Sequence, residues 1–516
     1  MIRTTLLLMT LATPLAAQEV PNYADETSSS DLTATFAGEW EFIVGGGVAS
    51  FDCNGDALPE IVIAGGTNPA SLWQNDSIAR GPLAFSRQKD TGVELTSVSG
   101  AYALDINSDA ITDLVLLRVG ENVVLRGLGA CRFRRANEDW GFDGGDAWST
   151  ALAATWEKGQ AWPTLAIGNY IDRAEEAFPW GSCTDNWLHR PEGNLFAPPT
   201  ALKPSFCALS MLFTDWNRSG QPALRVANDR EYYKGGQEQL WNVAPGEAPR
   251  LYTESEGWGR LRLWGMGIAS NDLNHDGYPE YFVTSMADNK LQTLAAVPTD
   301  GSMPKPEFAD VGFKRGVTAH RPYTGGELKP STAWHTQFED VNNDGLVDLF
   351  IAKGNVWEMP DFAMKDPNNL LLQKSDGSFV EAGDKAGVAS MQTARGASVV
   401  DFNADGLLDL VAINRNSPSE IWRNLGTASP ANWVSVVPRQ PAPNLDAIGS
   451  WVEVRTGEIT QRREVTVGGG HAGGVFGPQH FGLGAATAAD VRVIWPDGTA
   501  SDWQPVTANR VMTLSR

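Results

Sequence analysis

The chain has 516 residues, with 62 acidic against 40 basic side chains and a formal net charge of −22. A chain of this length can bury its own core, so its four cysteines do not define a disulfide scaffold. The strong negative charge disfavours binding to nucleic acid and to anionic membranes. We therefore expect no nucleic-acid partner.

Residues 1–17 predict a secretory signal peptide. Arg3 precedes an apolar run from Thr5 to Leu15, and the small residues Ala16 and Ala17 follow, which is the layout of a cleaved leader. No later stretch approaches the roughly 18 apolar residues that a membrane helix needs. We expect a secreted or periplasmic monomer without a transmembrane segment.

Five acidic loops follow along the chain, beginning at Asp52, Asp105, Asp272, Asp340 and Asp401. Each has Asp at position 1, Asn at position 3, Asp at position 5 and Asp or Glu at position 9. Alternate oxygen ligands in a tight loop suit Ca²⁺, a hard cation that takes about six to eight oxygens. A single loop of this kind could be an acidic turn, but five copies in register predict about five Ca²⁺ sites.

Each position has an expected role. Side chains at positions 1, 3 and 5 point inward, position 7 offers its backbone carbonyl, and position 9 closes the shell. The expected ligands are Asp52, Asn54, Asp56, Leu58 and Glu60; Asp105, Asn107, Asp109, Ile111 and Asp113; Asp272, Asn274, Asp276, Tyr278 and Glu280; Asp340, Asn342, Asp344, Leu346 and Asp348; and Asp401, Asn403, Asp405, Leu407 and Asp409.

Position 6 separates these loops into two groups. Gly277, Gly345 and Gly406 allow a sharp turn there. Ala57 and Ala110 stand in that place in the first two loops, which leaves the geometry of those loops open. Five bound Ca²⁺ ions would move the net charge from −22 to about −12.

The spacing of the loops indicates a repeat. Successive starts are 53, 68 and 61 residues apart, and a gap of 167 residues separates Asp105 from Asp272. Two degenerate copies fit inside that gap. One begins at Asp215 and ends in Ala223 where a carboxylate belongs, and the other lies near Thr155, where almost every ligand is missing. Seven copies result.

Each copy runs into a short apolar segment that reads as a buried strand. A repeat of this size has room for four short strands, which is one propeller blade. We therefore predict an all-β fold, a seven-bladed β-propeller over residues 32–428. A solenoid is the alternative, but neither end of the array resembles a polar capping repeat. Residues 18–31 are expected to form an N-terminal lead, and residues 429–516 a small C-terminal β domain.

The cysteines allow one bridge to be predicted. Cys183 and Cys207 bracket a proline-rich insertion, so we expect a disulfide between them. Cys53 lies at a non-ligand position of the first loop, where a buried free thiol is favoured over a bridge to Cys131.

Tryptophans accumulate where the loop ligands disappear. Seven of the 19 fall between Trp140 and Trp216. The rings either fill the space that a metal loop would have ordered, which is the favoured interpretation, or form a stacking platform for sugars or other flat ligands.

The loops followed by apolar strands resemble the FG-GAP/VCBS repeats of the integrin α-chain propeller. The tail, with Asn432-Trp433-Val434, His480-Phe481-Gly482-Leu483-Gly484 and Val493-Ile494-Trp495-Pro496-Asp497-Gly498, is similar to the ASPIC/UnbV domain of the cartilage acidic protein family. The resemblance implies a secreted Ca²⁺-binding propeller with a small C-terminal β domain.

Two function classes remain open, beside the third option of a purely structural secreted protein. The first is an extracellular binding module, with Ca²⁺ stiffening the blades and loops on one face recognising a protein or glycan. The alternative is a propeller-fold enzyme with its site at the mouth of the central channel. No GxSxG, HExxH or P-loop motif is present, so we lean against catalysis and assign no catalytic residue.

Overall fold

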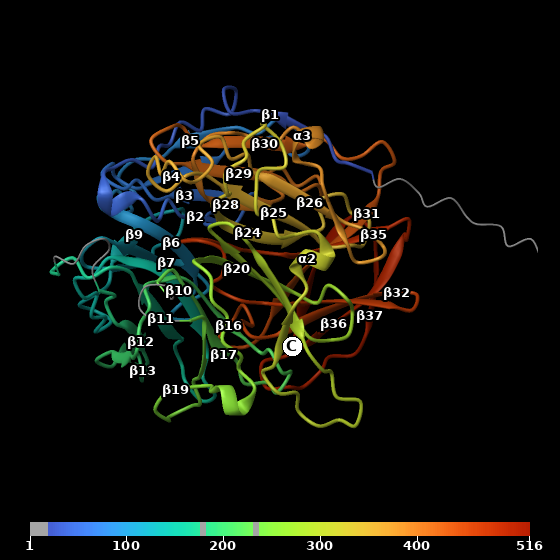
Figure 1. Ribbon diagram of the computed structural model, residues 1–516. Helices are drawn as coiled ribbons and strands as arrows, with labels where there is room; N and C mark the ends of the chain where they lie inside the picture. The colour runs from blue at the N-terminus through green and yellow to red at the C-terminus, as the bar shows by residue number, and fades with distance from the viewer. Residues whose placement is uncertain (1–18, 176–181, 231–236) are drawn as a thin grey trace, which may run out of the picture.

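The computed structural model describes residues 19–175, 182–230 and 237–516. The expected signal peptide, residues 1–17, lies outside the described residues. Within the described ranges the fold is all-β and of β-propeller type, and its helices are single turns (Figure 1). These short helices are η1 (Trp40–Phe42), η2 (Glu254–Glu256), α2 (Gly312–Arg315) and α3 (Gly383–Ala386).

Seven sheets, numbered here in chain order, make up the larger part of the described chain. Each contains four antiparallel strands, and β34 (Gly474–Phe476) adds a fifth, parallel strand to sheet 1. Sheet 1 contains β2 (Val48–Phe51), β3 (Glu60–Ile63), β4 (Ser71–Asn75) and β5 (Phe85–Arg87). Sheet 2 contains β6 (Val98–Leu104), β7 (Asp113–Arg118), β8 (Val123–Gly127) and β9 (Phe133–Arg135). Sheet 3 contains β10 (Ser149–Thr155), β11 (Thr164–Asn169), β12 (Asn186–His189) and β15 (Thr200–Leu202), with a small hairpin of β13 (Pro191–Glu192) and β14 (Leu195–Phe196) between the last two.

The remaining sheets repeat this pattern. Sheet 4 contains β16 (Ala208–Thr214), β17 (Ala223–Asn228), β18 (Gln239–Asn242) and β19 (Arg250–Leu251). Sheet 5 contains β20 (Gly265–Asn271), β21 (Glu280–Ser285), β22 (Lys290–Leu294) and β23 (Phe308–Asp310). Sheet 6 contains β24 (Ala333–Glu339), β25 (Asp348–Lys353), β26 (Asn369–Gln373) and β27 (Phe379–Glu381). Sheet 7 contains β28 (Ala394–Val400), β29 (Asp409–Asn414), β30 (Glu420–Asn424) and β1 (Tyr23–Asp25).

The apolar runs predicted as strands are confirmed, because all seven form the second strand of a sheet. The first strand of each sheet contacts the first strand of the next, and β28 of sheet 7 contacts β2 of sheet 1. These first strands are rich in Ala, Gly and Ser and are almost entirely buried. Small side chains are favoured here because seven strands approach one axis, where little room remains for each.

The described part of the expected N-terminal lead, residues 19–31, contributes a strand to the last sheet. Strand β1 pairs antiparallel with β30, so Tyr23 lies opposite Asn424. The Tyr23 hydroxyl also donates a hydrogen bond to the carbonyl of Leu408 at 3.0 Å. The N-terminal segment therefore completes the last sheet, and it holds the two ends of the array together.

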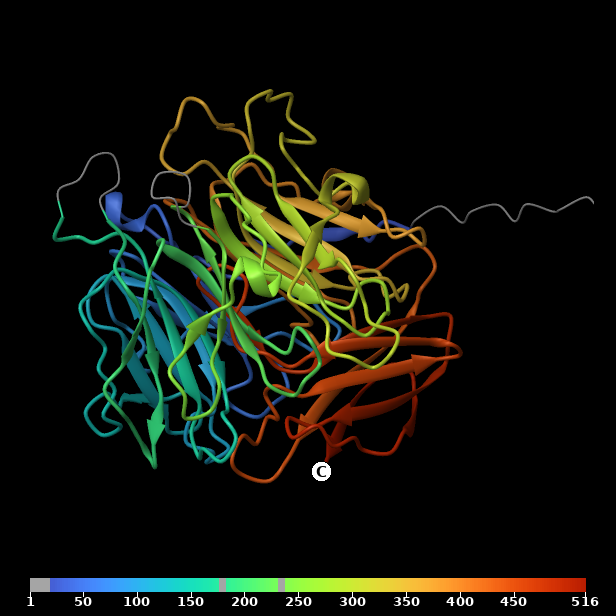
Figure 2. The ribbon, with the colours of Figure 1, turned by 60° about the horizontal axis from the view of Figure 1, so that its bottom comes forward.

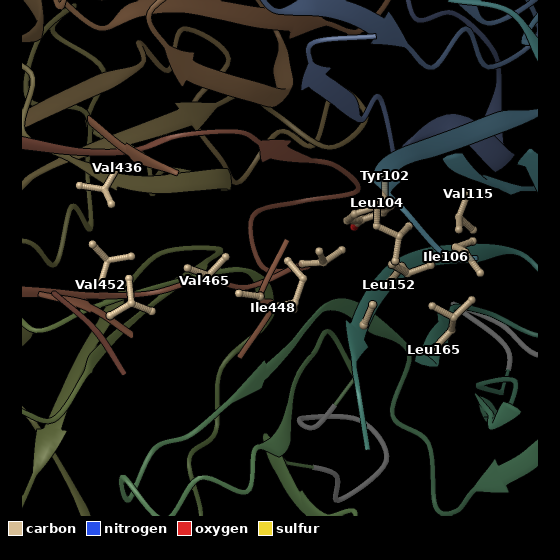
Figure 3. Close-up of a cluster of buried hydrophobic side chains, with 14 of the residues drawn as sticks. Tyr102, Leu104, Ile106, Val115, Leu152, Leu165, Val436, Ile448, Val452 and Val465 are labelled. Carbon is tan, nitrogen blue, oxygen red and sulfur yellow. The ribbon is translucent and has the colours of Figure 1, made fainter. Parts of the chain in front are cut away.

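The C-terminal residues form two further sheets. One contains β35 (Gln479–Gly484), β31 (Asn432–Arg439) and β38 (Arg510–Ser515), and the other β33 (Ile459–Glu464), β32 (Trp451–Thr456), β36 (Ala488–Ile494) and β37 (Gln504–Thr507). Figure 2 shows these strands, in red, lying against the seven sheets. The apolar side chains of the C-terminal part share one buried cluster with those of sheets 2 and 3, and Ile448 and Val465 lie in it with Leu104 and Leu152 (Figure 3). This shared core fixes the C-terminal part on the ring of seven sheets, which we call the disc.

A glycine-rich stretch of the C-terminal part enters the middle of the ring. We call Val467 to Gly474 the axial segment. It bridges to the first strands of sheets 3, 4, 5 and 2, and it continues into β34 (Gly474–Phe476), which pairs parallel with β2. A Cβ atom on Gly473 would overlap the carbonyl of Val48, and one on Gly470 would overlap the ring of His335. Glycine is needed because backbone runs against backbone along the axis.

Candidate metal centres

All seven copies of the loop repeat occupy one structural position, the connection between the first and second strands of a sheet. The loop at Asp52 joins β2 to β3, and the loop at Asp401 joins β28 to β29. The degenerate copies near Thr155 and Asp215 join β10 to β11 and β16 to β17. The structure therefore gathers the acidic loops on one side of the disc.

The carboxylate at position 1 is held in the same way in each acidic loop. One of its oxygens accepts a hydrogen bond from the backbone N–H at position 6, as from Gly345 to Asp340 Oδ2 at 2.7 Å and from Gly406 to Asp401 Oδ2 at 2.8 Å. Ala57 and Ala110 make the same bond at 2.9 Å, with positive φ angles of 68° and 65°. The turn is thus kept without glycine, at the cost of a left-handed alanine.

Position 5 shapes the second half of each turn. Its Oδ1 accepts the backbone N–H of position 7, at 2.8 to 3.0 Å in the five loops. The position 7 residues are Leu58, Ile111, Tyr278, Leu346 and Leu407. These bonds bring the backbone of position 7 back beside the acidic side chains.

The carboxylate at position 9 is buried in all five loops and ties the loop to its sheet. Asp409 accepts the N–H of Phe402 at 3.0 Å and that of Asn424, on the third strand, at 2.8 Å. Asp113 and Asp348 make the equivalent pairs of bonds. The longer Glu60 and Glu280 accept a position 2 N–H and the amide of the position 3 asparagine. This tethering role was not foreseen from the sequence.

Two buried oxygens in these loops have no hydrogen-bond partner among the described residues. They are Oδ1 of Asp272, at position 1 of the third acidic loop, and Oδ1 of Asn403, at position 3 of the fifth. A buried polar atom without a partner costs free energy. Both atoms belong to the expected ligand set and both are hard oxygen donors, so the residues present fit a Ca²⁺ ion.

Burial also raises the pKa values of the loop acids. The pKa of Glu60 is raised to about 8 and that of Asp113 to about 7, first by burial and then by neighbouring loop carboxylates. The pKa values of Asp340, Asp348 and Asp409 are raised well above the usual range for the same reasons. A bound cation would offset both the desolvation and the repulsion between these groups.

The three carboxylates of each loop do not yet converge. Among the described residues, the one group of three Cys, His, Asp or Glu side chains with ligand atoms all within 4.8 Å is Cys53, Glu60 and Cys131. Its sulfur atoms are joined in a disulfide.

Both cysteine pairs are bonded in the structure, Cys53 to Cys131 and Cys183 to Cys207, and no cysteine is free. The expectation of a free thiol at Cys53 is wrong. Cys131 comes from the connection between β8 and β9, which folds against the first acidic loop. The first bridge therefore ties a loop of sheet 1 to sheet 2.

The C-terminal part lies over several of the loops. Arg462 forms an ion pair with Asp272 at 3.2 Å, and His480 Nε2 lies 2.6 Å from Asn343 Oδ1. Gly406 faces the indole of Trp433 so closely that a Cβ atom would overlap the ring. The Asp52 loop, by contrast, is largely exposed. The side of the disc that carries the acidic loops is thus mostly covered.

The axial segment also occupies the place where an enzyme site at the channel mouth was considered. The cavity beside it, lined by Ile268, His335 and Glu339 among others, has a volume of about 140 Å³. Ligand pockets typically measure about 300–1,000 Å³. His471 and His480 are both buried.

Most of the clustered tryptophans are core residues. Trp140, Trp148, Trp162 and Trp216 are at most 6% exposed, and the rings of Trp140 and Trp162 meet edge to face with centroids 5.1 Å apart. The interpretation that these rings fill space is confirmed for these four. Trp156 and Trp187 are only partly buried.

Comparison with known proteins agrees with this structure. The profile of the FG-GAP-like repeat matches residues 340–412, and that of ASPIC and UnbV matches residues 440–516. The chain is thus a β-propeller-type protein with FG-GAP-like repeat sequence and a C-terminal ASPIC/UnbV segment, which confirms the resemblance.

Its curated relatives include cartilage acidic protein 1. The human protein is 36% identical over 166 residues and the Xenopus tropicalis protein 39% over 172 residues. Each match covers 32% of this chain but only 22% and 24% of the relatives, so the chain aligns with about a quarter of their length.

Two solved structures cover much of the chain. BBS1N, crystallised in complex with ARL6DN, covers 80% of this chain and 100% of that chain with a TM-score of 0.46 and 12% identity. AofleA from Arthrobotrys oligospora covers 66% of this chain and 86% of that chain with a TM-score of 0.35 and 11% identity. Within the described ranges of the present structure, no helix is long and apolar enough to cross a membrane.

Proposed function

We propose that this protein is a secreted or periplasmic seven-bladed β-propeller whose five acidic loops bind Ca²⁺, and that the stiffened disc is a binding module for an extracellular protein or glycan. The blade number is supported by seven sheets, each with four antiparallel strands, whose first strands are in contact around the ring. The two disulfides suit an oxidising compartment.

The observation that carries the Ca²⁺ proposal is the pair of buried, unpartnered oxygens on Asp272 and Asn403. Both occur at positions where the loop pattern requires a ligand. The role of the chain's own residues is to hold these oxygens in place. The position 6 N–H orients the position 1 carboxylate, while position 9 anchors the loop to its sheet.

The binding-module proposal follows from the side of the disc that stays open. Most of the acidic loops are covered by the C-terminal part, and the axis is filled. A partner would therefore bind at the opposite side, at the rim, or at the seam between the disc and the C-terminal part.

The experiment is thermal unfolding of the full chain with millimolar Ca²⁺ and with excess EGTA, combined with elemental analysis. Ca²⁺ at 100 times its dissociation constant should stabilise the protein by about 2.7 kcal/mol per independent site. We expect about five Ca²⁺ per chain and a clear fall in Tm on chelation. Identical melting curves together with no bound Ca²⁺ would exclude the metal sites.

A further inference from the structure

A large cleft that contains none of the expected Ca²⁺ ligands lies at the seam between the disc and the C-terminal part. Its volume is about 710 Å³, within the range of about 300–1,000 Å³ that is typical of ligand sites. Sites also occur preferentially where two structural units meet. We call this cleft the seam cleft.

Two of its walls are the degenerate copies of the loop repeat. Residues 155–160 and 219–222 line one side, and residues 440–444 of the C-terminal part line the other, with Asp497 and Arg516 at one end. The two repeats that lost their Ca²⁺ ligands are therefore the two that border the cleft. Their sequences are free to serve another purpose because no cation constrains them.

The C-terminal part orders one of these loops in place of a metal ion. Glu464 accepts the N–H of Asp215 and the hydroxyl of Thr214, both at 2.7 Å. Arg218 lies 4.0 Å above the ring of Trp451 and 3.6 Å from Glu453. The wall is thus rigid without Ca²⁺, and a rigid wall lowers the entropic cost of binding.

The charged groups of the seam cleft are mostly paired. Arg516 forms an ion pair with Asp497 at 2.6 Å, and Glu157 accepts hydrogen bonds from Arg190 at 2.7 Å and from Thr164 at 2.8 Å. Lys158 is exposed at the rim. A strongly charged ligand would find few counter-charges, so the cleft favours a neutral one.

The uncharged lining side chains include several amides and one indole. Gln160, Gln221 and Gln440 face the cleft, and amides can both donate to and accept from hydroxyl groups. Trp156, which is only partly buried, adds an aromatic ring. An aromatic ring with nearby amides suits a flat, hydroxyl-bearing ring.

Prolines argue against an extended peptide as the ligand. Pro222, Pro245, Pro441, Pro443 and Pro496 all line the cleft. Proline has no N–H, so these walls cannot pair with a peptide backbone as a sheet edge does. From these contacts we propose that the seam cleft binds a neutral oligosaccharide, with Trp156 under a sugar ring and the glutamines on its hydroxyls. This assignment rests on the proposed binding function and names its ligand class and place.

The test is calorimetric titration of the full chain, in Ca²⁺, with four neutral hexasaccharides: cellohexaose, xylohexaose, maltohexaose and chitohexaose. Oligogalacturonate and a proline-rich peptide serve as competing ligand classes. We expect at least one neutral hexasaccharide to bind and to protect residues 155–160, 219–222 and 440–444 from hydrogen exchange.

Three variants locate the site. Trp156→Ala should raise Kd at least tenfold and Gln221→Ala several-fold, whereas Trp357→Ala, on the opposite side of the disc, should leave Kd unchanged. Gln221 is exposed, so its variant remains informative even if Trp156→Ala fails to fold.

The proposal is overturned if no neutral hexasaccharide binds, if only oligogalacturonate or the peptide binds, or if binding is indifferent to Gln221→Ala and to Trp156→Ala when that variant is folded. The lining residues include none of the expected Ca²⁺ ligands. Failure here with normal Ca²⁺-dependent melting would refute the seam site alone, whereas loss of the Ca²⁺ effect would refute the metal sites alone.

Discussion

His471 of the axial segment donates its backbone N–H to Nδ1 of His335 on β24 at 3.1 Å, so the C-terminal part is hydrogen-bonded to the inner face of sheet 6. Both rings are buried, and His471 also receives the N–H of Gly45 on Nε2. Arg395 lies near the pair, with its guanidinium over Trp334. Two neutral imidazole rings are therefore packed at the axis of the ring.

Acidification should destabilise the fold through these two histidines. Burial lowers the pKa of His335 to about 4 and that of His471 to about 3, below the usual 6.5. Below pH 6.5 the unfolded chain binds a proton on each of these histidines and the folded chain does not. The stabilisation by the two neutral rings is therefore complete above pH 6.5, and the free energy of unfolding falls as the pH drops toward 4, by up to about 1.4 kcal/mol per pH unit for each histidine. Arg395 opposes protonation further, while Glu339 and Arg463 nearby are paired with each other. We would measure the free energy of unfolding of His471→Asn and of the wild type by denaturant unfolding in saturating Ca²⁺ from pH 7 to 5. The free energy should fall less steeply with decreasing pH in the variant. Parallel slopes would contradict the prediction.

Removing one loop acid should reduce the Ca²⁺ effect. Asp340→Asn keeps a side-chain acceptor for Gly345 but removes a charge from the expected ligand set. We expect a smaller rise in Tm on adding Ca²⁺ and one ion fewer by elemental analysis. Asp215→Asn is the matched control, because Asp215 makes the same bond to Gly220 in a loop without the full ligand set. Equal losses in the two variants would mean that the effect is not metal-specific.

Replacing the two alanines at position 6 with glycine should stabilise the protein. Ala57 and Ala110 adopt positive φ angles that glycine tolerates better. Ala57→Gly and Ala110→Gly should each stabilise the protein by about 1 kcal/mol, measured by denaturant unfolding. Gly345→Ala should have the opposite sign, since Gly345 has φ of 90°. Destabilisation by both Ala→Gly changes would show that the alanines are not strained.

The disulfides should contribute unequally. Cys53 and Cys131 are 78 residues apart, whereas Cys183 and Cys207 are 24 apart. Loop-closure entropy predicts a loss of about 4.5 kcal/mol for the double Cys→Ser change at the first pair and about 3.5 kcal/mol at the second. Calorimetric Tm values of the two double variants check this order, and a reversed order would count against it.

A buried ion pair offers a further test. Lys353 Nζ lies 2.8 Å from Asp366 Oδ1, both side chains are fully buried, and Ser331 Oγ contacts both. Lys353→Met alone should cost about 3–5 kcal/mol because it leaves a buried, unpaired carboxylate. The double change Lys353→Met with Asp366→Leu should cost less, as denaturant unfolding will show. A larger loss in the double variant would contradict this reasoning.

The sequence by itself determined the local features of this protein. The acidic loops, their period and the apolar strands behind them depend on residues that are near one another in the chain, so spacing and side-chain type were sufficient to place all seven hairpins. Even the degenerate copy near Thr155 could be located, because the period survives where the ligands do not.

Only the tertiary structure decided how the ring is closed and filled. Tyr23 meets Asn424, Cys53 meets Cys131, and the axial segment crosses the first strands of sheets that precede it by hundreds of residues. These contacts depend on the space left when seven sheets gather around one axis, and no local pattern records that space. The roles of the glycines in the axial segment and of the ligand-poor loops in the seam cleft follow only from the residues that pack against them.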